Sequence, residues 1–343
     1  PNNVVCGCVA TATAQVLRYF QWPQQGVGII EGSCNVTLAD PNKEPVAISV
    51  KHNLRGGDGQ GGAYDWSVMT LTPGSNESAE TLQQIGALCL DAGLSVNMGY
   101  NSGNKGSSAA GLGSSPFTKF CKYAGAKGSN GNQFDFARAN LDARRPIGVS
   151  ISPTISDEGH AIVMDGYGRV DGRWYYHLNM GWAGNSDGWY NFEETWGAQL
   201  WSKDVSIAFG NIYRQMLQEN ETQAGAIISG RVTDANGKPV AGAKVYLKKD
   251  GNLYQTMLAW YDPIDANETP IYKDWNGELP GAEKFRNTTD DNGIWAIDKL
   301  AAGTYEIVVE KDGLNFDGVK TITVANSNQW GINFVASAQE ELL

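Results

Sequence analysis

Apolar positions recur at helical spacing near the start of the chain. Residues 8–21 contain no glycine or proline, and Val9, Ala12, Val16 and Phe20 lie three or four positions apart within them. This spacing places the four side chains on one face of a helix. We therefore expect a central helix that buries this face and that ends at the proline and glycines that follow it.

Other patterns predict two further helices and a set of strands. Residues 79–92 have apolar positions at helical spacing, and Gly93 directly after them supplies a C-terminal stop. A shorter helix is expected over 134–143, and an irregular, glycine-rich segment over 26–63. Runs rich in β-branched and aromatic residues predict strands at 147–151, 160–166 and 173–179.

The composition changes after the first two hundred residues. Residues 214–226 are polar, acidic and small, which is typical of a linker, and we place domains over 1–216 and 217–343. In the second domain strand and turn signals alternate regularly, and this spacing predicts a β-sandwich. With 42 glycines, 14 tyrosines, 11 tryptophans and 18% charged residues, the chain is expected to be α+β or all-β.

Charge and hydropathy argue against two classes of partner. Lysine and arginine number 26 and aspartate and glutamate 37, so the net charge of −11 repels a nucleic-acid backbone. No apolar stretch approaches the ~18 residues of a membrane span, so no transmembrane segment is expected. Because the sequence starts at Pro1, we expect a targeting or pro-segment to have been removed or to lie outside it.

The cysteines suggest a nucleophile. Their odd count of five leaves at least one thiol unpaired, and Cys34, Cys89 and Cys121 are expected to be small buried residues. Cys8 is different because it opens the first predicted helix, directly after Gly7. The N-terminus of a helix stabilises a thiolate by at most about 2 kcal/mol, so a strongly activated thiol also needs a nearby imidazolium.

Three histidines could supply that imidazolium. His52 follows a lysine in the glycine-rich region and is expected to be a solvated loop residue. His160 and His177 lie on two predicted strands joined by a short loop, whose register would place His160 opposite Asn179 or Met180. An asparagine amide directly across a hairpin is close enough to orient an imidazole, so we choose His160 as the partner of Cys8. His177 is expected to be an ordinary strand residue, and a purely structural His160 is the alternative.

The blocks around these residues resemble the streptopain-type cysteine peptidases of bacteria, a branch of the papain-like fold. In the family's order over residues 1–214, they read GCVATATAQ, then WPQQG, YDW at 64–66, GHAIVMDGY at 159–167 and YHLNMGWAGNSDG at 176–188. The distance of about 150 residues from cysteine to histidine also fits papain-like peptidases. The resemblance implies Cys8 as nucleophile, His160 as general base and acid, and Asn179 and Trp182 in the segment that orients and shields the histidine.

Some features depart from the family pattern. NMGWAG stands where the family commonly has NWGWGG, so Met180 replaces an aromatic residue and Ala183 a glycine. Papain-like enzymes often supply the second oxyanion donor from a glutamine six positions before the cysteine, which is Asn2 here. Cys6 has no counterpart in the pattern. The catalytic domain of the family also begins well before the cysteine, so its N-terminal part is expected to be missing or cleaved.

Substrate contacts are expected along one loop and from several indoles. Residues 96–111 are the expected adaptable wall of the cleft, although an ordinary surface loop would have the same composition. The candidate indoles, which could equally belong to the core, are Trp66, Trp189, Trp196 and Trp201.

The second domain resembles a different family. Over residues 227–337, ISGRVTDANGKPVAGAKVYL and TTDDNGIWAIDKLAAGTYEIVV are similar to the two signature hairpins of carboxypeptidase regulatory-like, transthyretin-type sandwiches. The resemblance implies a domain that spaces, anchors or stabilises. Asp290 and Asp291 are expected to lie in a turn instead of a calcium site, and no metal or cofactor is predicted. Residues 250–287 form a long insertion and a candidate contact surface.

These features combine into one expectation: an α+β papain-like peptidase domain followed by a small all-β, Ig-like or transthyretin-like sandwich. We expect a bacterial cysteine endopeptidase, secreted or at the cell surface or in the periplasm, that hydrolyses protein or peptide substrates through a Cys8 acyl-enzyme. A zymogen inhibited by its own propeptide is expected. One alternative is a catalytically impaired adhesin or peptide-binding protein, and another is an acyltransferase or amidase on the same fold.

Overall fold

The computed structural model divides into two compact units. The first unit comprises Pro1–Gln133 and Pro146–Arg214, and the second comprises Phe134–Arg145 and Gln215–Leu343. The structure describes residues 4–40, 42–70, 73–74, 76–101, 107, 111–128, 134–152, 159–192, 204–213, 225–254, 273–274, 277–278, 286–325 and 327–339.

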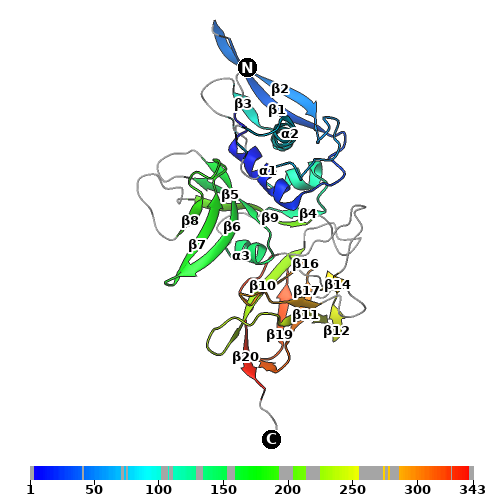
Figure 1. The fold of residues 1–343 in the computed structure, drawn as a ribbon, viewed down its shortest axis with the longest axis vertical. Helices are drawn as coiled ribbons and strands as arrows, with labels where there is room; N and C mark the ends of the chain where they lie inside the picture. Colours follow the sequence, from blue (N-terminus) through cyan, green and yellow to red (C-terminus); the bar gives the residue numbers. More distant parts are fainter. Residues whose placement is uncertain are drawn as a thin grey trace. The chain divides into compact units, whose positions relative to one another are not determined.

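In the part of the first unit that the structure describes there are three helical segments (Figure 1): α1 (Cys8–Phe20), α2 (Ala79–Ser95) and the short π-helix η1 (Pro116–Phe120). The first predicted helix is confirmed, with Val9, Ala12 and Val16 buried. Among the described residues, no helix is long and apolar enough to cross a membrane.

Helix α2 continues through Gly93, where the sequence predicted that it would end. A Cβ atom added at Gly93 would lie 1.9 Å from the hydroxyl oxygen of Tyr100. The glycine is therefore needed for close packing against the following strand, and the helix ends with Val96 as its C-cap.

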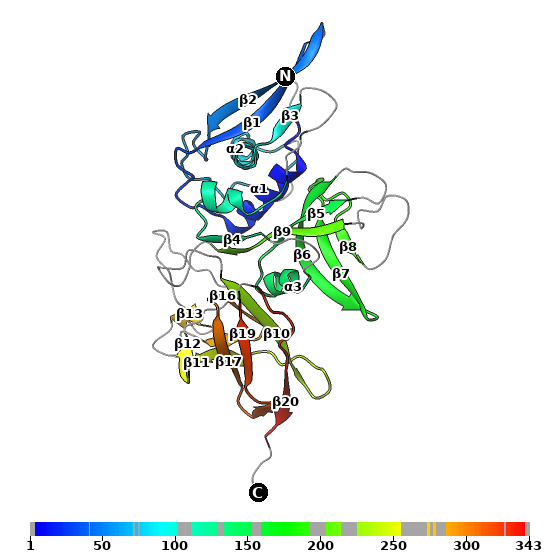
Figure 2. The same ribbon diagram turned by 180° about the vertical axis from the view of Figure 1, so that it is seen from behind.

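The main sheet of the first unit has six strands in the order β4-β9-β5-β6-β7-β8, and every paired neighbour is antiparallel. Helix α1 packs against β5 and β6 (Figures 1 and 2). The predicted strands at 147–151, 160–166 and 173–179 are all present in it. The bounds are β4 (Gly125–Lys127), β5 (Ile147–Ser152), β6 (His160–Val170), β7 (Arg173–Asn179), β8 (Gly188–Tyr190) and β9 (Asp204–Tyr213).

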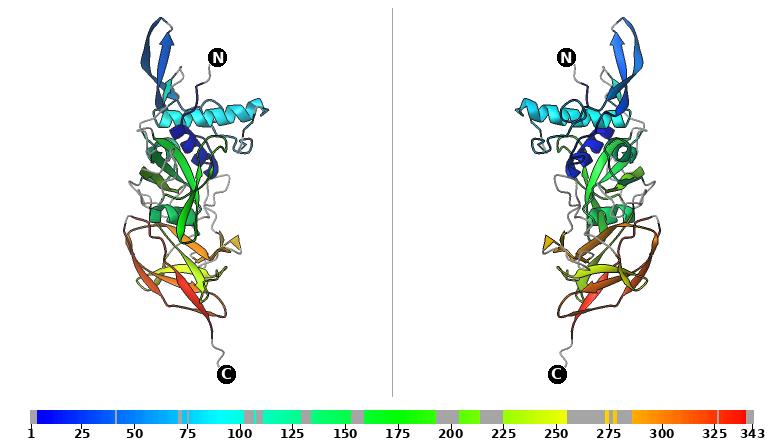
Figure 3. Two further views of the ribbon diagram at one scale, coloured as in Figure 1. Left: turned by 90° about the vertical axis from the view of Figure 1, so that its left-hand side faces the viewer. Right: turned by 90° about the vertical axis from the view of Figure 1, so that its right-hand side faces the viewer.

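A long hairpin occupies the segment that was expected to be irregular. β1 (Glu31–Asp40) and β2 (Lys43–Asn53) pair antiparallel, and β3 (Gly99–Asn101) joins β1 in parallel. The hairpin, in blue in Figure 3, extends away from α2. The expectation was wrong because the glycines around the hairpin hid an alternation of apolar and polar residues. The cross-strand apolar pairs are Cys34 with Val50, Val36 with Ile48 and Leu38 with Val46.

Two sheets with a shared core make up most of the second unit. One has the order β16-β10-β20-β18 and the other β12-β11-β17-β19, with β15 beside β11. Trp295, Tyr305 and Phe334 are fully buried in the core. The bounds are β10 (Ala226–Asp234), β11 (Lys244–Lys249), β12 (Asn252–Tyr254), β13 (Lys273–Asp274), β14 (Gly277–Glu278), β15 (Arg286–Thr288), β16 (Ile294–Leu300), β17 (Gly303–Glu310), β18 (Leu314–Phe316), β19 (Lys320–Val324) and β20 (Phe334–Ala338).

The acidic DDNG segment before β16 forms a turn. Oδ1 of Asp290 accepts hydrogen bonds from the backbone N–H groups of Asn292 and Ile294, at 2.9 Å each. Gly293 has a φ of +72°, in the left-handed region that glycine adopts without strain. The Asp290 carboxylate therefore serves the turn. Most of the predicted insertion at 250–287 lies outside the described residues.

Helix α3 (Phe134–Asp142) belongs to the second unit, although the predicted boundary places it in the first domain. The Arg145 side chain that follows it donates from Nε to Oδ2 of Asp298 at 2.9 Å, and both side chains are only 2% exposed. The Asn328 amide donates to the carbonyl of Phe136 at 3.3 Å. These partners lie more than 150 positions away in the chain, so no local pattern indicates the assignment.

Candidate active site

Cys8 is the first residue of α1, directly after the N-cap residue Gly7. No side chain caps the N-terminus of α1 among the described residues, and no acidic residue lies in its first turn. The first N–H groups of the helix therefore remain available, and they favour negative charge on a sulfur or an oxyanion placed there. Gly7 is required at this point because its φ is +88° and an added Cβ would lie 2.3 Å from the Met98 methyl group.

His160 is the first residue of β6 and is 8% exposed. Its Nε2 lies 2.9 Å from the main-chain oxygen of Met180. Because a carbonyl oxygen can only accept a hydrogen bond, Nε2 carries the proton of the neutral ring. The basic nitrogen is therefore Nδ1, and a main-chain group fixes this tautomer.

The indole of Trp182 stacks on the imidazole of His160. The ring centroids are 4.6 Å apart and the planes are inclined by 19°. Burial lowers the pKa of His160, and the hydrogen bond to Met180 opposes this effect in part. Trp182 itself is 42% exposed, so it covers the histidine with one face and meets solvent with the rest of its ring.

We predict that Trp182→Ala raises the pKa of His160 towards the ordinary value for histidine. Loss of the indole admits water to the imidazole, which stabilises its charged form. Histidine Cε1–H chemical shifts, followed against pH in a Cys8→Ala background, measure the effect, and the chain has only three histidines to assign.

Trp189→Ala is the matched control, because the Trp189 ring packs against His177 with centroids 5.3 Å apart. The pKa of His160 should be the same in this variant as in the parent. A His160 pKa that falls or stays constant in Trp182→Ala would contradict the role of the indole.

The sequence predicted that the Asn179 amide orients His160, but within the described residues no hydrogen bond joins these two side chains. Oδ1 of Asn179 accepts hydrogen bonds from Nε2 of Gln15 at 2.8 Å and from the backbone N–H of Gly181 at 3.0 Å. Asn179 lies opposite Val163 in the hairpin. The amide therefore ties α1 to the start of the 180–187 loop, and the carbonyl of the next residue, not the amide, orients the histidine.

The register of the β6–β7 hairpin explains why Asn179 does not lie opposite His160. Asp171 and Gly172 form a two-residue turn with φ values of +50° and +82°, which pairs Val170 with Arg173. A bulge between Met164 and Gly166 then shifts the pairing by one residue. Neither feature can be read from the loop composition. The tight turn alone would pair Asn179 with Met164, and the bulge moves it back by only one residue, to Val163, so it does not lie opposite His160.

Gln15 is a site residue that the sequence analysis missed. It lies two turns along α1 from Cys8, on the GCVATATAQ block. The only signal in the sequence was a long polar side chain among the apolar and small residues of the first two turns of the helix, which is a weak one. Its hydrogen bond to Asn179 spans 164 positions of the chain and connects the helix of the nucleophile with the loop of the histidine.

The two departures from the family pattern have different consequences. Met180 is 2% exposed, and its N–H donates to Oδ1 of Asp187 at 2.8 Å while its carbonyl faces His160. Because the main chain of Met180 binds His160, the replacement of an aromatic side chain by methionine leaves this contact intact. Ala183 has a φ of +54°, a left-handed conformation that costs an alanine about 1 kcal/mol and a glycine nothing.

The structure brings the elements that carry Cys8 and His160 together, since α1 packs against β5 and β6. Among the described residues, no hydrogen bond or ion pair joins the two side chains. Asn2, the sequence position of the second oxyanion donor, lies outside the described residues. The available oxyanion donors are therefore the N–H groups at the start of α1.

The other two histidines lie elsewhere in the fold. Nδ1 of His177 is 2.6 Å from Oδ1 of Asp165 on the exposed part of the β6–β7 hairpin. His52 is exposed, but on strand β2 and not in a loop as predicted, and it contacts the carbonyl of Asn53. Neither histidine approaches α1 through any contact seen in the described part of the chain.

The residues that the sequence proposed for the cleft lie in different environments. Trp66 is 9% exposed and its ring packs against Tyr64, so it belongs to the core. Trp189 is 58% exposed. Trp196 and Trp201, together with most of the 101–111 loop, lie outside the described residues.

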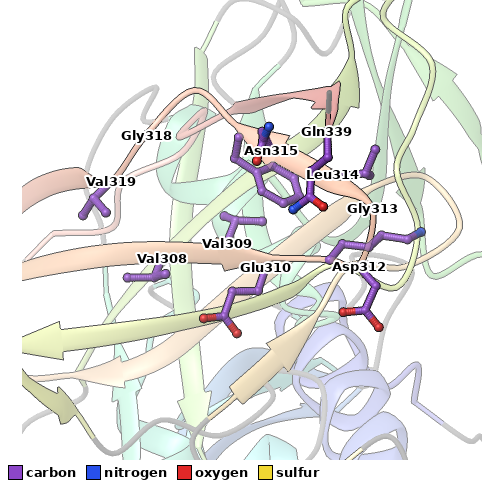
Figure 4. A pocket seen from close by; sticks show the side chains of 12 residues that line it. Val308, Val309, Glu310, Asp312, Gly313, Leu314, Asn315, Gly318, Val319 and Gln339 are labelled. Atoms are coloured by element: carbon purple, nitrogen blue, oxygen red, sulfur yellow. The ribbon is translucent and has the colours of Figure 1, made fainter. Parts of the chain in front are cut away.

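A pocket of about 500 Å³ opens in the second unit beside β17 and β18 (Figure 4). Its lining combines carboxylates such as Glu310 and Asp312 with apolar side chains such as Val309 and Leu314. The lining contains no thiol, hydroxyl nucleophile or imidazole. This pocket therefore lacks the thiol and the imidazole that a cysteine-type acyl transfer needs.

Comparisons with known proteins show the family of the chain. Residues 1–190 match the model of the Peptidase C10 family. The chain is 30% identical over 204 residues to streptopain of Streptococcus pyogenes, which covers 56% of this chain and 46% of streptopain. It is 27% identical over 188 residues to the thiol protease/hemagglutinin PrtT of Porphyromonas gingivalis, which covers 53% of this chain and 20% of PrtT. The chain thus spans about half the length of streptopain.

A solved structure is also similar. The active wild-type interpain A cysteine protease of Prevotella intermedia is 26% identical, with a TM-score of 0.47, over 60% of this chain and 82% of that chain. The family match covers more than half of the chain and includes Cys8, His160, Asn179 and Trp182. The predicted streptopain-type resemblance is therefore confirmed, and the chain belongs to the Peptidase C10 family of cysteine peptidases.

Proposed function

We propose that this chain is a cysteine endopeptidase that hydrolyses peptide bonds through an acyl-enzyme on Cys8. One observation carries the proposal. Cys8 opens a helix that packs on the strand beginning with His160, and the Met180 carbonyl holds that histidine with Nδ1 as its basic nitrogen. A thiol at a free helix N-terminus and a fixed imidazole on the adjoining strand are the two groups that nucleophilic acyl transfer needs.

In the proposed reaction Nδ1 of His160 takes the proton of the Cys8 thiol, and the sulfur attacks the carbonyl carbon of the scissile bond. The negative charge that develops on the carbonyl oxygen meets the N–H groups at the start of α1. His160 then gives its proton to the leaving amine, and a thioester remains on Cys8. Water attacks the thioester with His160 as general base, which releases the acid product and restores the thiol.

The remaining site residues support this dyad in the proposal. Trp182 stacks on the imidazole and covers one face of it, which strengthens the Nε2 hydrogen bond by excluding water. Asn179 holds the turn that aims the Met180 carbonyl at His160. Gln15 braces Asn179 from α1, so it is a positioning residue.

We predict that Gln15→Ala lowers kcat by about 10- to 100-fold with little change in KM, because a small displacement of His160 affects proton transfer more than substrate binding. Initial rates on an unfolded protein substrate measure this. Gln83→Ala, at an exposed position on α2, is the matched control and should behave as wild type. A rise in KM with unchanged kcat would instead place Gln15 among the substrate contacts.

The biological setting is part of the proposal. Streptopain and the PrtT thiol protease/hemagglutinin are bacterial proteases, and this chain would likewise act on protein or peptide substrates. We place it outside the cytoplasm, secreted or at the cell surface or in the periplasm, as a zymogen that its own propeptide inhibits.

The second unit is proposed to be a carboxypeptidase regulatory-like, transthyretin-type sandwich. Its support is the pair of sheets around one core and the turn at Asp290, which agree with the signature hairpins of the sequence. The proposed role is to space, anchor or stabilise the catalytic part. The domain limits of 1–216 and 217–343 are kept, except that 134–145 is now assigned to the sandwich.

The test is cleavage of a denatured protein by the wild-type chain and by Cys8→Ala. Wild-type cleavage that disappears in the variant is the expected result, and mass spectrometry of the products distinguishes hydrolysis from acyl transfer. Products that carry an added amine would favour the acyltransferase alternative. An intact substrate in both reactions would favour a binding protein.

A further inference from the structure

Two cysteines that the proposed mechanism does not use lie beside each other in the first unit. Cys6, in the segment before α1, has its Sγ 4.0 Å from the main-chain oxygen of Cys89 on α2. Cys6 donates to this oxygen, and both thiols are free and half-buried. Cys34 and Cys121 differ, since both are buried and burial raises the pKa of each. Residues 6 and 89 therefore form a dithiol.

The two thiols differ in acidity. Once Cys6 is ionised, hydrogen bonding by the Cys89 side chain favours the thiolate and lowers the pKa of Cys6 to about 7. The same hydrogen bond, together with burial, raises the pKa of Cys89. A substantial fraction of Cys6 is therefore thiolate near neutral pH, with a neutral thiol held against it. A thiol whose pKa is near the ambient pH attacks disulfides fastest, and its neighbour is placed to complete the exchange.

The dithiol lies next to the N-terminus of α1, the helix that begins with Cys8. Only Gly7 separates Cys6 from Cys8, and the Gly7 carbonyl accepts hydrogen bonds from the backbone N–H and the hydroxyl of Thr11, at 2.9 Å each. Hydrogen bonding by the Thr11 side chain also favours the Cys6 thiolate and lowers its pKa. Val5, one residue earlier, is 61% exposed. A covalent bond at Cys6 would therefore fix a lightly held segment directly before Cys8.

We propose that Cys6 and Cys89 form a disulfide bond that anchors the segment before the nucleophile to α2. The oxidant is a small-molecule disulfide. The Cys6 thiolate attacks one sulfur of this oxidant, which forms a mixed disulfide and releases one small thiolate. Cys89 then loses its proton and attacks the Cys6 sulfur, and the second small thiol leaves. Two cysteine thiols are oxidised, and one small disulfide is reduced to two thiols.

The neighbours of Cys6 favour Cys89 over Cys8 as its partner. The sulfur of Cys6 contacts Cys89 and Thr11, while Cys8 has no hydrogen bond to Cys6 within the described residues. The bond therefore leaves the Cys8 thiol free. It closes a long loop between the two segments, and such loops give the largest stabilisation from a cross-link.

The experiment oxidises the full chain with glutathione disulfide at pH 7.5 to 8, blocks the remaining thiols by alkylation under denaturing conditions, and maps the peptides without reduction. The expected product has one cross-link, between Cys6 and Cys89, and three alkylated cysteines at Cys8, Cys34 and Cys121. The melting temperature of the oxidised wild type should exceed that of the reduced protein by about 5–10 °C.

Cys89→Ser should lose both the cross-link and the shift in melting temperature, whereas Cys34→Ser should keep both. A Cys6–Cys8 cross-link, or a wild-type chain that stays fully alkylated at five cysteines, would overturn the proposal. The peptide map of the wild type decides this even where a variant fails to fold. Since it requires no enzymatic activity, it is also independent of the proposed peptidase function.

Discussion

Replacing Cys8 by alanine is expected to lower kcat/KM for peptide hydrolysis by about 10⁴- to 10⁶-fold. The substitution removes the atom that forms the acyl-enzyme, while the helix that carries it stays intact. Alanine is a strong helix former, and the Cys8 side chain makes no hydrogen bond within the described residues. The loss of rate should therefore come without a loss of fold, which circular dichroism of the same samples checks.

Cys34→Ser is the matched control for this variant. Cys34 is a buried thiol on β1 that takes no part in the site, so its replacement should retain the wild-type kcat/KM. Equal rates for Cys8→Ala and wild type would show that another group is the nucleophile. Initial rates on an unfolded protein, measured with the full chain, separate these results.

Replacing Asp298 by alanine is expected to destabilise the second unit by about 3–5 kcal/mol. The substitution leaves the Arg145 guanidinium in a site where it is 2% exposed and where Asp298 no longer compensates its charge. The penalty is the loss of a buried, charge-assisted contact that offsets the desolvation of the guanidinium, and it exceeds any net gain of the pair. The midpoint and slope of urea unfolding of the full chain, followed by circular dichroism and tryptophan fluorescence, measure the change.

An exposed ion pair provides the control. Glu31 lies 2.9 Å from Lys51, with side chains 56% and 72% exposed, so Glu31→Ala should cost less than about 1 kcal/mol. The double variant Arg145→Met/Asp298→Leu removes both charges and should recover most of the stability that Asp298→Ala loses. A single variant that costs no more than Glu31→Ala would contradict the buried pair as a determinant of stability.

The sequence predicted those parts of the site that depend on short segments. The helix of residues 8–20 follows from the spacing of Val9, Ala12 and Val16, and the position of Cys8 at its start follows from the flexible Gly7 before it. The strands that begin at residues 160 and 173 follow from runs of β-branched and aromatic residues. All of these signals come from residues that are close in sequence to the ones whose structure they predict.

Prediction failed where partners are distant or where one residue shifts a register. The tight turn at Asp171 and Gly172, only partly offset by the bulge after Met164, placed Asn179 opposite Val163, and the backbone carbonyl of Met180 became the partner of His160. A carbonyl is present in every residue, so no side-chain pattern can identify the one that orients a histidine. The hairpin of residues 31–53 was missed for a different reason, since its alternating apolar residues lie among glycines and prolines.

The sequence by itself determined the helix, the place of Cys8 at its N-terminus, the strand that begins near His160 and the family, because periodicity, helix termini and motif blocks are local properties of the chain. Only the tertiary structure decided that Gln15 braces Asn179, that Cys6 meets Cys89, and that the helix at 134–142 packs with the second unit. These contacts join segments between 83 and 192 positions apart. Their geometry depends on how whole elements pack, and no short stretch of sequence contains it.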